Sequence, residues 1–255
     1  MPLQKPYRRL IRPFTRTRER YEWDYQGSSE SYLFSPQYAP DRIEFVRAYR
    51  LIEDDLIQIF EYVQPANKNV SVYSHRLFQL LLRACTEFEA NAKAILKANG
   101  YSKPSNFNMT DYYKLEPACR LSEYRVRTSV WSEHDRIFQP FKSWNGTVDY
   151  VPLSWYQGYN DSKHDRTANF PAASFENVLN AVAGVFVILF AQHYIHAFDP
   201  YRAVTMTQED EEGFLAHSMP LFHIQPPRGW SESEKYDFDW KQLALHAEAF
   251  DRFPF

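Results

Sequence analysis

The longest apolar run in the chain, VLNAVAGVFVILFA at residues 178–191, limits the folds that the sequence can adopt. A membrane-spanning helix needs about 20 apolar residues, whereas this run is shorter and contains Asn180. The run therefore predicts a helix that is buried on all sides in the core of a folded domain. Pro171 suits the first turn of this helix and Pro200 its end, so we expect the helix over residues 171–198.

Two earlier segments have the spacing of apolar residues that partners of this core helix require. Over residues 41–64 and 74–99, apolar side chains recur every three or four positions. Ser74 is a suitable N-cap for the second segment, and Gly100 follows its last apolar residue as a C-terminal signal. The pattern predicts two long amphipathic helices that pack against the core helix.

The segment between these helices and the core helix changes character along its length. A short helix is expected over residues 110–122, with a kink at Pro117. Residues 124–144 are rich in β-branched and aromatic side chains on either side of SEHD, which predicts a small extended or β-hairpin insert. The expected fold class is therefore mainly α: an antiparallel helical bundle with this small insert.

Charge is distributed unevenly between the two ends of the chain. Residues 1–20 contain seven Lys and Arg against one Glu, whereas residues 207–255 contain ten Asp and Glu against four Lys and Arg. We therefore expect a basic N-terminal arm (1–39), a helical bundle (40–200) and an acidic C-terminal extension packed on the same domain (201–255). The arm could contact nucleic acid, or the two ends could neutralise each other within the fold or a dimer.

Composition excludes several classes of protein. Hydrophobic residues make up 44% and charged residues 24% of the chain, which is typical of a folded globular domain. The seven glycines are scattered, so the fingerprints of Rossmann and P-loop folds are missing. Cys85 and Cys119 are the only cysteines and have no zinc-site spacing. We expect a cytoplasmic protein with no membrane partner, no metal and no cofactor.

Polar and ionisable side chains gather in one stretch directly ahead of the core helix, SWYQGYNDSKHDRTANF at residues 154–170. A helix start exposes unpaired N–H groups and the positive end of the helix dipole, and so favours anions. The stretch is therefore either a ligand-binding or catalytic site, or a cap for the helix behind it.

The order of three segments in the chain resembles a known family. LFQLLLRACTEFEANAKAIL, followed by WYQGYNDSKHDR and SFENVLNAVAGVFVILF, is similar to the HEPN superfamily (higher eukaryotes and prokaryotes nucleotide-binding) of small helical bundles. The resemblance covers roughly residues 41–198. It implies either a metal-independent ribonuclease of prokaryotic toxin, abortive-infection or antiviral systems, or a degenerate module for binding or dimerisation.

Active members of that family carry an Arg, a polar residue and, a few positions later, a His at the start of their last long helix. Asn160 and His164 match the second and third elements of this motif. The expected Arg is absent from the preceding positions, which hold Gln157, Gly158 and Tyr159. The motif of this chain is thus a degenerate one.

Cleavage of RNA by its own 2′-hydroxyl group requires a base, an acid and stabilisation of charge on the phosphate. His164 is the only His of the motif, and histidine is the residue type best suited to act as acid or base near neutral pH. The candidate catalytic residues are His164, Asn160 and Arg166, and the candidate ligand-binding residues are Lys163, Tyr159 and Asp161. In these roles, Lys163 and Arg166 would hold phosphate oxygens, and Asn160 would orient His164 or the ribose. In a homodimer, two copies of the motif could form one groove.

A purely structural interpretation of the same residues is equally specific. Asn160 or Asp161 would cap a helix, and His164 would form a hydrogen bond to a neighbouring helix. Lys163 and Arg166 would pair with one of the nearby carboxylates, Asp161, Asp165 or Glu176.

Two functional hypotheses follow. The first is a HEPN-like module of a prokaryotic defence or stress system that binds a protein partner, a nucleotide or RNA. The alternative is an active ribonuclease that uses His164.

Other residues are weaker candidates for a functional role. Glu87, if it faced inward, could pair with Lys163 or Arg166. His193 and His196 have a spacing compatible with a metal but more typical of histidines at a helix end.

Overall fold

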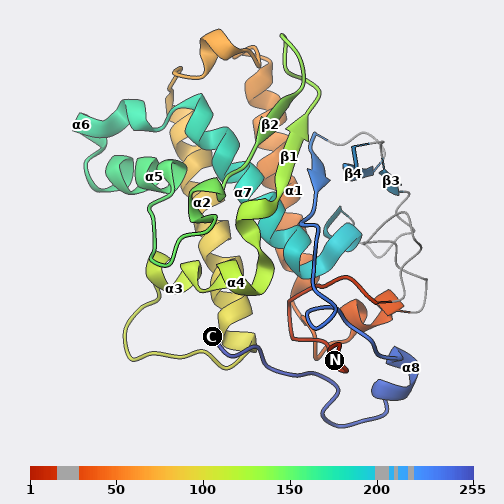
Figure 1. Cartoon of the computed structure of the whole chain (residues 1–255). Coiled ribbons are helices and arrows are strands. Elements are labelled where there is room, and N and C mark those ends of the chain that lie inside the picture. Colours follow the sequence, from red (N-terminus) through yellow and green to blue (C-terminus); the bar gives the residue numbers. More distant parts are fainter. Residues whose placement is uncertain (16–28, 199–206, 210–211, 218–220) are drawn as a thin grey trace.

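The computed structural model describes residues 1–15, 29–198, 207–209, 212–217 and 221–255 (Figure 1). Its α-helices are α1 (Arg42–Phe60), α2 (His75–Ala98), α3 (Met109–Tyr113), α4 (Leu115–Cys119), α5 (Ser154–His164), α6 (Arg166–Asn169), α7 (Phe175–His193) and α8 (Trp240–Leu243). Its strands are β1 (Arg125–Thr128), β2 (Arg136–Phe138), β3 (Thr207–Glu209), β4 (Leu215–His217) and β5 (His223–Gln225). Helices dominate these elements, which confirms the mainly α fold with a small β insert.

The apolar run forms α7, the central helix of the bundle. From Ala181 to His193 every side chain of α7 is buried. By length and composition the segment Phe175–Ala197 could cross a membrane, but most of it is covered by the surrounding protein, as expected for a core helix. The helix begins later than predicted, because Ser174 accepts a hydrogen bond from the Asn177 amide and so provides the N-cap.

The helices around α7 do not all run in the same sense. At one end, the Phe175 amide donates a hydrogen bond of 2.7 Å to the carbonyl group of Val72, just before α2. At the other end, the Gln192 side chain bonds Asn91 of α2. These contacts show that α2 and α7 run in the same direction. The expected antiparallel packing holds between α1 and α7, because the Arg42 side chain at the start of α1 reaches the carbonyl group of His196 after α7.

Local signals explain the bounds of the two long outer helices. The Ser74 side chain accepts a hydrogen bond from the Leu77 amide at 3.2 Å, as an N-cap does. Gly100, just past the end of α2, has a φ of 88°, a left-handed conformation that glycine adopts most easily. The predicted helices at 41–64 and 74–99 therefore correspond to α1 and α2, with shorter ends.

The predicted helix at 110–122 is divided into α3, α4 and a 3₁₀ turn at Leu121–Glu123. The predicted kink at Pro117 is wrong: the break lies at Lys114, between α3 and α4, and Pro117 lies inside α4. An Asn108 capping box defines the start of α3 and fixes its direction independently of α4.

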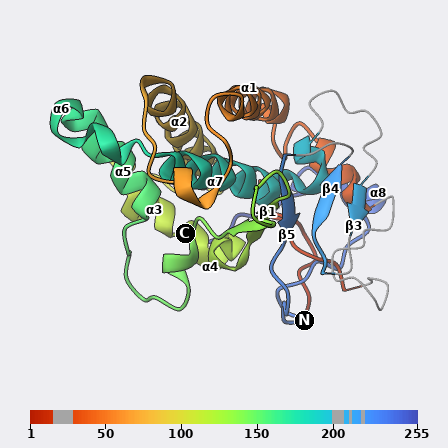
Figure 2. The same cartoon turned by 90° about the horizontal axis from the view of Figure 1, so that it is seen from above.

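The insert at 124–144 contains the predicted hairpin, in which β1 and β2 pair antiparallel with Val126 opposite Phe138. The chain that follows α7 adds three strands to it, in the sheet order β2-β1-β5-β4-β3. The sheet lies beside α7 at the end of the bundle opposite α5 and α6 (Figure 2).

Segments from both ends of the chain complete the core. Leu10 is fully buried, and the Ile11 amide donates a hydrogen bond to the Ala191 carbonyl of α7. Leu3 and Phe14 both form parallel bridges with Tyr236, whose hydroxyl group donates to the carbonyl of Leu10. Residues 16–28 of the expected basic arm lie outside the described residues.

Candidate functional site

The polar motif does not lie at the start of the long core helix, so that prediction is wrong. Residues 154–164 form a separate helix, α5, and the short α6 follows it. The helix α7 begins only at Phe175. Lys163 and His164 therefore occupy the last turn of α5, where the helix dipole is negative and favours cations. This end of the molecule projects from the bundle, with α6 at its edge (Figure 2).

A close approach of α5 to α7 explains the glycine within the motif. A Cβ atom at Gly158 would lie 2.5 Å from Asn177 Nδ2 and 2.9 Å from the carbonyl oxygen of Ala172. Trp155 packs one turn earlier on Gly184 of α7 and donates a hydrogen bond from its indole to a backbone carbonyl. The two helices run antiparallel, and this packing fixes α5 in position.

A glutamate of α2 organises the inner face of α5. The Tyr156 hydroxyl donates a hydrogen bond of 2.9 Å to Glu89 Oε1, and Lys93 Nζ lies 3.3 Å from Glu89 Oε2. Burial, followed by the charge of Glu89, raises the pKa of Tyr156, so this phenol remains a proton donor. The carboxylate that meets α5 is thus Glu89 and not Glu87, whose backbone carbonyl accepts from Asn91.

The predicted ligand-binding residues behave differently from one another. Lys163 Nζ donates to the Tyr159 hydroxyl at 2.9 Å, and this hydrogen bond raises the pKa of Lys163. Tyr159 is itself buried, so its ring faces the protein interior. Asp161 accepts a hydrogen bond from Gln157 one turn earlier at 2.7 Å. Of the three predicted ligand-binding residues, only Tyr159 and Lys163 contact each other.

The predicted catalytic residues lie at the surface. The side chains of His164 and Arg166 are exposed, and in the described part of the chain neither forms a hydrogen bond or an ion pair. Asn160 is half-buried and precedes His164 by one helical turn, a spacing at which side chains are neighbours. The expected clasp of His164 onto a neighbouring helix is therefore absent among the described residues.

The caps and ion pairs that the structural interpretation predicted also differ from those in the structure. Asp165 caps α6 by accepting from the Ala168 amide at 3.1 Å, a role predicted for Asn160 or Asp161. Glu176 pairs with Arg136 of β2 instead of a cation of the motif. We call residues 163–166, which include both exposed cations and His164, the α5–α6 tip.

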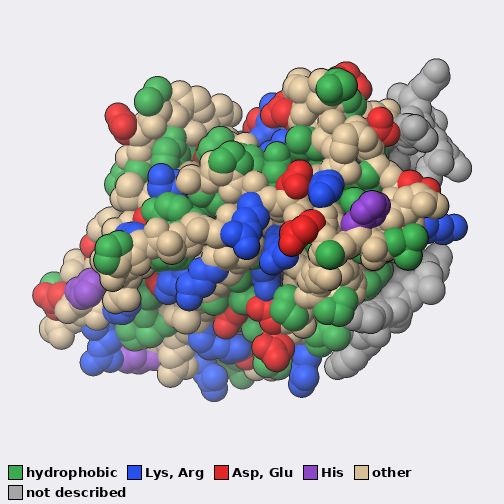
Figure 3. Space-filling model, turned by 90° about the horizontal axis from the view of Figure 1, so that it is seen from below, with side chains coloured by type: hydrophobic (Ala, Val, Ile, Leu, Met, Phe, Trp, Pro, Cys, Tyr) green, Lys and Arg blue, Asp and Glu red, His purple; other side chains and the backbone are tan. Residues whose placement is uncertain are grey.

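A basic cavity, which the sequence reasoning missed, lies farther along α2. It has a volume of about 600 Å³ and lies between the N-terminal segment, residues 36–41 and the second half of α2. Its cations are Arg8, Arg9, Lys93 and Lys97, and we call it the α2 cavity. The end of the molecule at which α2 finishes carries many Lys and Arg side chains (Figure 3). The sequence signal was the segment EANAKAILKA, in which lysines alternate with alanines at helical spacing.

The two histidines at the end of α7, His193 and His196, lie in different environments. His193 is fully buried, and neither ring nitrogen has a hydrogen-bond partner, whereas His196 lies against the Phe34 ring. Within the described residues, no three His, Cys, Asp or Glu side chains are grouped so that they could hold a metal ion. Cys85 and Cys119 are both buried and are not joined in a disulfide.

Comparisons with known proteins add no relative to this description. No family model, no curated protein and no solved structure matches the chain.

Proposed function

We propose that the protein is a HEPN-like module that binds RNA through the α5–α6 tip without cleaving it. The observation that carries this proposal is the exposure of Lys163, His164 and Arg166 within four residues on a projecting part of the molecule. Cations that are free of carboxylate partners are suited to phosphate groups of a nucleic-acid backbone. The resemblance to the HEPN superfamily supports the same class of ligand and a role in a cytoplasmic defence or stress system of a prokaryote.

The surroundings of His164 favour binding over cleavage. General acid–base catalysis of RNA cleavage needs two proton-transfer groups and a donor for the phosphate charge. Asn160, the neighbour of His164 on α5, cannot transfer a proton at neutral pH.

Binding of a fluorescein-labelled single-stranded RNA of about 20 nucleotides, followed by anisotropy, tests the proposal. In Lys163→Ala/Arg166→Ala we expect weaker binding and a salt dependence whose slope is smaller by about 1.4, or roughly 0.7 for each lost phosphate contact. Lys241→Ala, at an exposed position on α8, is the matched control and should bind as the unaltered protein does. Equal affinity and equal slope in the double variant would exclude the tip as the RNA contact.

The alternative is an active, metal-independent ribonuclease, in which a homodimer would pair two tips. One observation favours it: His164 is exposed and free to meet a substrate. Incubation of the protein with labelled RNA in the presence of a chelator decides between the two functions. Cleavage that disappears in His164→Ala would establish the ribonuclease, whereas intact RNA with retained binding supports the binding module.

A further inference from the structure

We propose that the α2 cavity is a second ligand site, which binds a phosphate monoester. Its volume of about 600 Å³ is enough for a small metabolite, since ligand pockets begin at about 300 Å³. It shares no residue with the α5–α6 tip. The two proposals are therefore independent, and either can fail without the other.

Two cations of the cavity have no internal partner. In the described part of the chain, neither Arg8 nor Lys97 forms a hydrogen bond or an ion pair through its side chain. The Nε atom of Arg8 is buried without an acceptor, which is an unfavourable state for a charged donor. An anionic oxygen atom in the cavity would supply that acceptor in a charge-assisted hydrogen bond.

Arg9 neutralises the carboxylate that borders the cavity. Its guanidinium group pairs with Asp41 and donates a hydrogen bond of 3.1 Å to Gln192 Oε1 in the core. The backbone of Arg9 has a φ of 58°, a left-handed conformation that is uncommon for residues other than glycine. This turn in the chain lets Arg9 anchor the segment on the core while Arg8 lines the cavity.

The start of α1 borders the same cavity. Pro40 and Asp41 border the cavity directly ahead of this 19-residue helix. Asp41 occupies the N-cap position, but its side chain makes no capping hydrogen bond, because it is engaged by Arg9. Asp41 and Glu44, in the first turn, already place negative charge at the start of α1, so the cations of the cavity are what would hold an anion there.

The other lining residues indicate what the phosphate would be attached to. On α2 the cavity is bordered by three alanines at a spacing of four, Ala90, Ala94 and Ala98, which leave room above the helix. Pro36 and Tyr38 lie among the lining residues from the loop before α1. Tyr38 itself is fully buried, so the surface left for the rest of the ligand consists of the small apolar side chains and the proline, which suit a flat ring system, whereas the cations suit a phosphate monoester of charge about −2. A nucleoside monophosphate has both parts, and so does the 5′-phosphorylated end of an RNA.

Calorimetric titration of the full chain with AMP, and separately with inorganic phosphate and with adenosine, tests this inference. We expect AMP to bind, phosphate to bind more weakly and adenosine to give no heat. Arg8→Ala/Lys97→Ala should weaken AMP binding by about a hundredfold, at roughly tenfold for each lost charge-assisted contact. Ala94→Leu, which keeps every charge but fills the space above α2, should also abolish binding.

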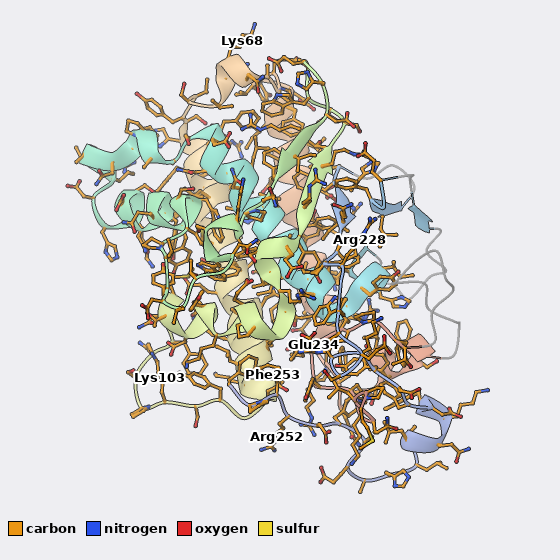
Figure 4. All side chains as sticks on the ribbon, in the orientation of Figure 1. Lys68, Lys103, Arg228, Glu234, Arg252 and Phe253 are labelled. Carbon is orange, nitrogen blue, oxygen red and sulfur yellow. The ribbon has the colours of Figure 1, made fainter. Side chains whose placement is uncertain are left out.

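The matched control is Lys68→Ala, because Lys68 is an exposed lysine at the opposite end of the molecule from Lys103, Arg252 and Phe253, which lie around the end of α2 (Figure 4). Binding of adenosine as tightly as AMP, unchanged AMP binding in both cavity variants, or no heat with either AMP or phosphate would each overturn the proposal. A further measurement distinguishes a free nucleotide from the 5′ end of an RNA as the source of the phosphate. It compares the binding of 5′-phosphorylated RNA and of 5′-hydroxyl RNA to the Lys163→Ala/Arg166→Ala protein. A preference for the 5′-phosphate that is lost in Arg8→Ala/Lys97→Ala identifies an RNA end, and AMP binding without that preference identifies a free nucleotide.

Discussion

The side-chain amide of Gln192 on α7 donates a hydrogen bond of 2.7 Å to Asn91 Oδ1 on α2, and both residues are fully buried. The same Gln192 side chain accepts from Arg9, so that one core amide connects α2, α7 and the N-terminal segment. Buried amides of this kind stabilise the fold only while every partner is present. The position of the α2 cavity thus depends on a hydrogen-bond network in the core.

Replacement of Gln192 by Leu should lower the free energy of unfolding by about 1–3 kcal/mol, because Asn91 and Arg9 lose a hydrogen-bond partner in the buried core. Urea unfolding measures the change. Gln79→Leu, at an exposed position of α2, should change stability by less than about 0.5 kcal/mol. Similar stability of the Gln192→Leu and Gln79→Leu proteins would mean that the network contributes nothing.

Truncation of the core helix should be more costly. The Phe186 ring stacks on Tyr49 of α1 with a centroid distance of 5.5 Å and is only 2% exposed. Phe186→Ala should therefore destabilise the protein by about 3–5 kcal/mol, and Leu189→Ala by about 2–5 kcal/mol, through lost burial and the cavity left behind. Leu51→Ala, which removes a side chain that is 60% exposed, serves as the comparison and should have little effect in the same unfolding experiment.

Addition of one methyl group at Gly158 should loosen α5. The new Cβ would overlap Asn177 and the backbone oxygen of Ala172, so we expect Gly158→Ala to cost about 1–3 kcal/mol. Removing the first clash in Gly158→Ala/Asn177→Ala should recover only part of this loss, since the backbone contact remains. Thermal unfolding of the two variants shows whether the double variant is more stable than Gly158→Ala and less stable than the unaltered protein. A single variant as stable as the unaltered protein would contradict the close packing of α5 on α7.

Stability should fall on mild acidification because of His193. Burial, reinforced by the nearby charges of Arg9 and Arg42, lowers the pKa of His193 well below 6.5. Below pH 6.5 the unfolded chain binds a proton at this residue while the folded protein does not, so acid favours unfolding by up to about 1.4 kcal/mol per pH unit. Unfolding free energies measured between pH 7.5 and 5 should show this slope, and His193→Gln should reduce it. An equally steep slope in the variant would assign the acid sensitivity to other groups.

Removal of the exposed His164 should leave the fold intact. His164 makes no hydrogen bond or ion pair in the described part of the chain, so His164→Ala should change the free energy of unfolding by less than about 0.5 kcal/mol. Calorimetric unfolding gives this value directly. A loss of 1 kcal/mol or more, as is typical of a buried hydrogen-bonded histidine, would favour the structural interpretation of the motif.

Periodicity and caps in the sequence were sufficient to predict the elements that local chemistry determines. Ser74 and Gly100 defined α2, and the apolar run defined α7 as the buried centre of the bundle. In contrast, the tail strands β3, β4 and β5 are short, and they join the hairpin only through β5, which pairs with β1 from a distant part of the sequence. Their residues therefore gave no local pattern strong enough to predict a five-stranded sheet.

The candidate site was likewise predicted only where it depends on residues that are close in sequence. The exposed tip could be predicted because its polar residues are consecutive in the sequence. Its position at the end of a separate helix, α5, was not predicted, because Pro171 indicated that the core helix begins directly after the motif. The α2 cavity combines Arg8 with Lys97, which are separated by most of α2 and all of α1, and only the fold brings them together. Glu89 likewise became the partner of α5 because of how α2 is rotated toward that helix.

The common direction of α2 and α7 has a consequence for the synthesis of the protein on the ribosome. Two helices that run in the same direction need a long connection, here residues 99–174, before the second can dock on the first. The apolar face of α2, including Leu81, Phe88 and Ile95, therefore remains without its main partner until translation has passed the end of α7. Such late, non-local closure slows folding and exposes an aggregation-prone surface in the nascent chain.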